Sequence, residues 1–77
     1  MRQRLLVAPD AMGFACSQVP FPCMWELVEY LSYQRVAVIY HYHASHFTVT
    51  FQRMDLESAQ RLLDEWVHAE SAELQTA

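Results

Sequence analysis

Hydrophobic and polar residues alternate along residues 35–53, and this alternation predicts two antiparallel strands joined at Ala44 and Ser45. If Tyr42 lies opposite Phe47, every second residue of both strands falls on one apolar face. That face consists of Val36, Val38, Tyr40, Tyr42, Phe47, Val49 and Phe51. The opposite face consists of Ala37, Ile39, His41, His43, His46, Thr48, Thr50 and Gln52. The register therefore predicts one buried face and, on its back, three histidines near the hairpin tip.

Two segments with helical periodicity flank this hairpin. Proline suits the first helical position, so a helix is predicted from about Pro22 to Tyr33. Its apolar stripe contains Met24, Leu27, Val28 and Leu31. Asp55 is a good N-cap for a second helix, whose carboxylate would accept the free amides of the first turn. The stripe of this helix contains Leu56, Ala59, Leu63 and Trp66, and the tail over 70–77 is predicted to fray.

The first third of the chain is read as a strand followed by a long loop. Residues 3–8 are predicted to form a short strand that Pro9 and Asp10 end. Residues 9–21 contain Gly13 and two of the three prolines, so they are predicted to be a connection. The apolar content of this segment is high for a loop, and we expect it to lie over the core or to close a ligand pocket.

The resulting order, β-α-β-β-α, predicts one α+β domain over residues 1–77. A right-handed crossover places both helices on one face of a three-stranded, mainly antiparallel sheet, in a two-layer sandwich. This arrangement is similar to a ferredoxin-like fold that lacks its last strand, a likeness of architecture that implies no function. The other sheet face and the strand edges would be open, which favours a homodimer.

Composition excludes several classes of protein. The chain has 77 residues and a net charge of −4, with five basic residues, all arginine, and nine acidic ones, so it is a poor candidate for nucleic-acid binding. The apolar run near Met1 is too short for a signal peptide, and none is long enough to span a bilayer. We therefore expect a cytosolic protein. Cys16 and Cys23 would be reduced there, and their spacing matches neither a redox motif nor a common zinc site.

One surface is predicted to bind a partner protein. Trp25 falls on the polar side of the first helix, together with Glu26, Glu29 and Tyr33. Tryptophan is enriched at binding hot spots, and flanking acids suit a basic partner surface. The alternative is that the apolar loop before the helix folds over Trp25.

The three histidines form a second candidate site. His41 and His43 leave the same side of one strand, and His46 lies across the turn, so their rings could hold zinc with water as the fourth ligand. No carboxylate lies within 35–53 to orient the rings, and a shift of one residue in the turn would separate them. A third use is pH sensing at a dimer interface.

Sequence motifs for catalysis are absent: the chain has no P-loop, dinucleotide fingerprint or nucleophile elbow. An enzyme is therefore not expected. The leading prediction is an acidic interaction module, namely an adaptor, inhibitor or regulatory subunit. The alternatives are a metal-binding protein using His41, His43 and His46, and a ligand-binding module closed by the 9–21 loop.

Overall fold

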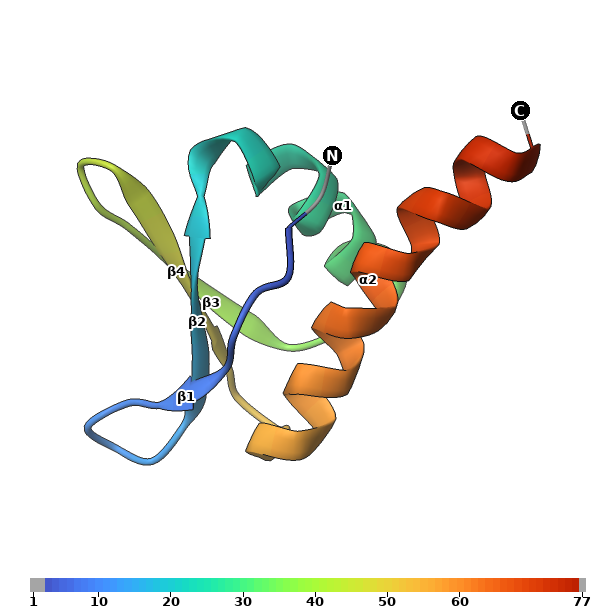
Figure 1. Ribbon diagram of the computed structural model, residues 1–77. Coiled ribbons are helices and arrows are strands. Elements are labelled where there is room, and N and C mark those ends of the chain that lie inside the picture. The colour runs from blue at the N-terminus through green and yellow to red at the C-terminus, as the bar shows by residue number, and fades with distance from the viewer. Residues whose placement is uncertain (1–2, 77) are drawn as a thin grey trace.

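The computed structural model describes the backbone of residues 3–76 and the side chains of residues 3–69. The elements are β1 (Ala8–Pro9), β2 (Ala15–Pro20), a 3-10 turn η1 (Phe21–Cys23), α1 (Met24–Tyr33), β3 (Val38–Tyr42), β4 (His46–Phe51) and α2 (Leu56–Thr76). Both helices lie on the same side of one sheet, as Figure 1 shows. The predicted α+β class is thus confirmed. None of the helices described is both long and apolar enough to cross a membrane.

The sheet has four strands in the order β1-β2-β4-β3, and every neighbouring pair is antiparallel. Because β2 and β3 are both antiparallel to β4, they run parallel to each other with β4 between them. The connection from β2 to β3 passes through α1. The prediction of three strands was wrong, because it placed one of the two central strands in a loop.

That missed strand is β2, whose six residues lie within the predicted 9–21 loop. Its side chains alternate: Ala15, Ser17 and Val19 are buried, while the residues between them face the open side. The predicted strand over 3–8 is also wrong, since only Ala8 in that range belongs to a strand. The strand does end at Pro9, as predicted, and Pro9 itself belongs to β1 and pairs with Ala15.

A short turn joins β1 to β2. The Asp10 carboxylate accepts hydrogen bonds from the backbone N–H groups of Met12 and Phe14, at 2.8 and 2.9 Å. Gly13 has φ +88°, a left-handed conformation that glycine adopts without steric cost. Gly13 therefore lies in a tight turn, and Pro9 and Pro20 lie at the ends of β1 and β2, instead of in a long loop.

The hairpin has the predicted register. Tyr42 pairs with Phe47, and the His43 N–H donates to the His46 carbonyl over 2.8 Å, which leaves Ala44 and Ser45 as the turn. Phe47 is fully buried against the helices, as are Val49 and Phe51. Tyr42 lies on the same face but is 60% exposed, contrary to prediction, because the hairpin tip projects beyond the helices at the upper left of Figure 1.

The two helices complete the core much as predicted. Leu27 and Leu31 of α1 are buried, and α2 adds Ala59, Leu63 and Trp66. The Asp55 carboxylate accepts the Ser58 N–H at 2.7 Å, which confirms the N-cap. Leu56, expected in the stripe of α2, is instead 41% exposed. The backbone of α2 is helical to Thr76; fraying of the tail over 70–77 stays a prediction, and Ala77 lies outside the described residues.

Candidate functional site

The outer face of α1 exposes two large aromatic side chains. Trp25 is 76% exposed and Tyr33 is 77% exposed, whereas Leu27 and Leu31 on the inner face are buried. The preceding segment therefore does not cover Trp25. An α-helix rises 1.5 Å per residue, so the two aromatic residues stand roughly 12 Å apart along the axis. Together they form the ends of one exposed stripe.

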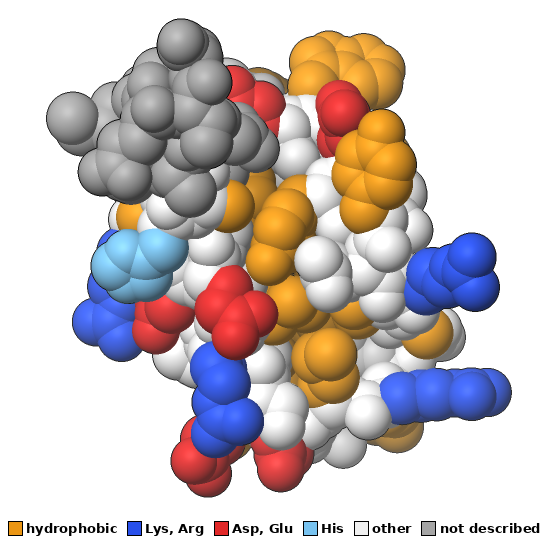
Figure 2. Space-filling model, turned by 90° about the vertical axis from the view of Figure 1, so that its right-hand side faces the viewer, with side chains coloured by type: hydrophobic (Ala, Val, Ile, Leu, Met, Phe, Trp, Pro, Cys, Tyr) orange, Lys and Arg blue, Asp and Glu red, His pale blue; other side chains and the backbone are white. Residues whose placement is uncertain are grey.

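Acidic side chains complete this stripe. Glu29 is four residues from Trp25 and four from Tyr33, so it lies between them on the helix surface. Glu26 is also exposed and belongs to the first turn of α1. Figure 2 shows hydrophobic and acidic side chains side by side over α1, at the upper right of this view. We call Trp25, Glu26, Glu29 and Tyr33 the α1 surface; it combines apolar contact area with negative charge.

The three histidines of the hairpin come together as the predicted register requires. The ring centroids of His41 and His43 are 4.8 Å apart, and those of His43 and His46 are 4.5 Å apart. Both pairs are stacked, with ring planes 25° apart. The histidines thus form a ladder across the open face of the sheet near the hairpin tip.

Two ring nitrogens of this ladder have hydrogen-bond partners within the hairpin. His43 Nε2 lies 3.0 Å from Thr48 Oγ1, and His46 Nδ1 lies 3.1 Å from Ser45 Oγ. Stacked rings direct their nitrogens side by side rather than toward a common point. Among the described side chains, no group of three or more His, Cys, Asp or Glu is placed to hold a metal ion. Metal binding would therefore require the rings to turn.

Partial desolvation lowers the pKa of His43 although its side chain is exposed, and the adjacent His46 and His41 rings lower it further because like charges repel. The neighbouring strand positions on this face are Gln18 and Thr48, which carry no charge to offset the repulsion. Protonation of His43 is thus disfavoured in the folded chain.

The segment 9–21 does not form the lid that the ligand-binding alternative needs. Val19 is buried as part of β2, while Met12 and Phe14 extend from the β1–β2 turn with 80% and 44% exposure. Cys16 of β2 donates its thiol to the Ala8 carbonyl at 3.4 Å. Burial raises the pKa of this thiol, and the nearby Asp10 carboxylate raises it further, which disfavours the nucleophilic thiolate.

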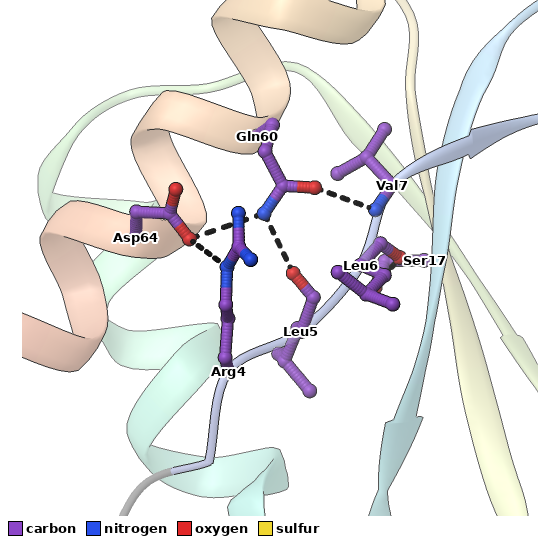
Figure 3. A network of polar contacts seen from close by, with 7 residues as sticks. All are labelled: Arg4, Leu5, Leu6, Val7, Ser17, Gln60 and Asp64. Atoms are coloured by element: carbon purple, nitrogen blue, oxygen red, sulfur yellow. Dashed lines mark hydrogen bonds and ion pairs between the residues drawn. The ribbon is translucent and has the colours of Figure 1, made fainter.

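A polar network that the sequence did not reveal ties residues 4–7 to α2 (Figure 3). The Gln60 side chain donates to the Leu5 carbonyl at 2.8 Å and accepts the Val7 N–H at 2.9 Å. Gln60 also donates to Asp64, which pairs with Arg4 at 3.2 Å. The hydrogen bond and charge of Arg4 lower the pKa of Asp64. This network ties the first segment to α2, and the Ser17 hydroxyl, which donates to the Leu6 carbonyl at 2.9 Å, ties the same segment to β2.

No protein-family model matches the chain, and no curated protein or solved structure matches it either. Function is therefore inferred from the residues and geometry of this chain alone.

Proposed function

We propose that this protein is a small interaction module that binds a basic surface of a partner protein through the α1 surface. In this role it acts as an adaptor, inhibitor or regulatory subunit, as a homodimer, in the cytosol, and by binding rather than catalysis. The observation that supports the proposal is the 76% exposure of Trp25. Leaving so large an apolar ring in water is unfavourable, and covering it with a partner would release that cost.

Charge supports the same partner chemistry. Glu26 and Glu29 flank the aromatic residues, and the chain as a whole has a net charge of −4. Acids at the rim of an interface attract a positive partner and mainly increase the association rate. A basic protein surface with a pocket for an indole ring is therefore the partner we propose.

The architecture is compatible with such a role. The unit β2-α1-β3, with β4 between its two strands, is a split β-α-β motif. We propose that the fold is ferredoxin-like without its last strand, with the short β1 beside β2 in place of that strand. In this arrangement the sheet and the inner faces of the helices form the hydrophobic core. The outer face of α1 stays exposed and can bind a partner.

The test is binding of the Trp25→Ala variant to a partner purified from the native lysate and reconstituted from isolated components. We expect calorimetry to show a dissociation constant roughly 30-fold higher or more, the effect of losing a hot spot. Met12→Ala is the matched control, because Met12 is 80% exposed but extends from the β1–β2 turn. Equal loss in both variants, or a large drop in the melting temperature of Trp25→Ala, would contradict the proposal.

A second candidate is divalent-metal binding by His41, His43 and His46. The observation in its favour is the proximity of the three rings, with centroids 4.8 and 4.5 Å apart. The test is elemental analysis and zinc titration of tag-free protein. One zinc per chain that His43→Ala abolishes would favour this candidate over the interaction module, and uptake that His43→Ala leaves unchanged would exclude it.

A further inference from the structure

The two outer edges of the sheet differ in how well they could accept a further strand. The β1 edge has only two residues, and one of them, Pro9, has no N–H to offer a neighbouring strand. The β3 edge has five residues, Val38–Tyr42, with neither a proline nor an aspartate, glutamate, lysine or arginine. Natural proteins blunt sheet edges with short strands, proline and charge. The β1 edge is blunted in this way, and the β3 edge is not.

The hydrogen bonds of the hairpin determine which groups this edge presents. The Gln52 N–H donates to the Ala37 carbonyl at 3.1 Å, and the His43 N–H donates to the His46 carbonyl. In an antiparallel pair such residues alternate with residues whose backbone groups point away from the partner strand. Val38, Tyr40 and Tyr42 are therefore the residues that direct N–H and C=O groups outward. Within residues 3–76, no backbone hydrogen bond from another element reaches this side of β3.

We propose that a second copy of this chain adds to the β3 edge, antiparallel and about a two-fold axis at Tyr40. This inference deepens the proposed function, since it names the surface that forms the homodimer. In this pairing Tyr40 lies opposite Tyr40 of the second copy, and Val38 lies opposite Tyr42. Every outward N–H and C=O of β3 then has a partner, and the two sheets become one.

Side chains at the edge favour this register. Val38 and Tyr42 form aromatic–β-branched pairs on the helix side of the sheet, a favourable cross-strand combination. On the open side, Ile39 lies opposite His41 of the second copy, so the two histidine ladders do not meet directly. Ile39 is 52% exposed in the single chain, and Tyr42 is 60% exposed. Pairing would cover part of both side chains.

Symmetry explains why the occupant is a second copy and why assembly stops there. A two-fold interface uses the same edge from both chains, so it closes on itself. The edges that remain are formed by β1, which Pro9 and its short length blunt, and by residues 17–20 of β2 beyond it, a short stretch that ends in Pro20. The proposed product is a discrete dimer and not a fibre.

The experiment is light scattering coupled to size-exclusion chromatography over a concentration series, together with amide hydrogen exchange by NMR. For the wild type we expect a mass near twice the 9.0 kDa of one chain. We also expect protected N–H groups at Val38, Tyr40 and Tyr42. Ile39→Lys should raise the dimer dissociation constant about tenfold or more and remove that protection, because in both halves of the interface a charged side chain replaces the apolar one opposite His41. Leu6→Lys is the control, since Leu6 is 68% exposed and lies outside β3.

Dimer formation through β3 and partner binding through the α1 surface can be tested separately. A monomer at every concentration would overturn it, and so would a dimer whose three β3 amides exchange freely. A folded Ile39→Lys monomer that still binds the partner would support the inference and show that the α1 surface acts independently. If Trp25→Ala loses partner binding but remains a dimer, the α1 surface and the β3 edge likewise act independently. Tyr42→Pro, which removes one outward N–H, provides a second variant with the same expected loss of dimer.

Discussion

Substitution of Gln60 tests whether a single side chain secures the first segment of the chain to α2. In Gln60→Ala, the Leu5 carbonyl and the Val7 N–H lose their partners, at 2.8 and 2.9 Å in the native chain. Both bonds are partly buried, so water replaces them incompletely. At about 1 kcal/mol for each hydrogen bond, the expected loss is about 2 kcal/mol of the free energy of unfolding.

This loss is large for so small a domain. For 60–100 residues, 1 kcal/mol corresponds to a shift of roughly 4–8 °C in melting temperature, so Gln60→Ala should melt roughly 8–16 °C lower. Alanine is a better helix former than glutamine, so helix propensity cannot account for a decrease. The assay is urea denaturation and thermal melting by circular dichroism, with hydrogen exchange at the Val7 amide as the local probe.

Arg61→Ala is the matched control on the same helix. Arg61 makes an exposed ion pair with Glu57 at 3.4 Å, and such pairs contribute about 0.5 kcal/mol or less. A second variant, Gln60→Glu, keeps an acceptor for the Val7 N–H but cannot donate to the Leu5 carbonyl and adds a negative charge beside Asp64. We expect it to be destabilised as well. If Gln60→Ala unfolds within 0.5 kcal/mol of the wild type and the Val7 amide stays protected, burial of Leu5 and not this network holds the segment.

Three further predictions concern single contacts. Ser17→Ala removes a buried hydroxyl that donates to the Leu6 carbonyl at 2.9 Å, and should cost about 1 kcal/mol in urea denaturation; unchanged stability would contradict this. Asp55→Ala should lower the melting temperature and Asp55→Asn should restore most of it, because the cap accepts the Ser58 N–H; equal melting of all three proteins would exclude the cap. Folding lowers the pKa of His43, so the unfolded chain binds the proton first as pH falls below about 6.5. The free energy of unfolding should therefore decrease from pH 7 to 5.5. His43→Gln should flatten that slope in thermal melts, and a slope of equal size in both proteins would refute the assignment.

Asp55 and Asp64 contribute to the pH dependence of stability in a more acidic range than His43. Hydrogen bonds to the Ser58 backbone and side chain lower the pKa of Asp55, and Arg4 lowers that of Asp64. Each folded-state pKa lies below the unfolded value, so the stability that these groups contribute is present above that value and is lost only in more acidic solution. Between pH 7 and 5.5, the change in stability should therefore come from His43 rather than from Asp55 or Asp64.

The two candidate sites could be predicted to different degrees. Helical spacing alone placed Trp25 and Tyr33 on the face opposite Leu27, and the structure leaves both aromatic rings exposed. Alternation in the hairpin placed the three histidines together, but it could not show that their rings stack or that Thr48 and Ser45 bond to them. Ring orientation depends on side-chain torsions and on cross-strand neighbours, and the residue order does not specify these.

Sequence alone determined the elements whose stabilising contacts are local: the hairpin register at Tyr42 and Phe47, the helix stripes apart from Leu56, and the Asp55 cap. Periodicity and capping act between residues a few positions apart, so they can be read from the chain. Tertiary structure decided the position of β2, because Ala15–Pro20 becomes a strand only when it pairs with β4, about thirty residues later in the chain. Local signals from Gly13 and the prolines favoured a loop there, and long-range pairing overrode them. That pairing makes β4 central and leaves β3 at the edge, so the surface proposed for the dimer follows from the fold and not from any motif.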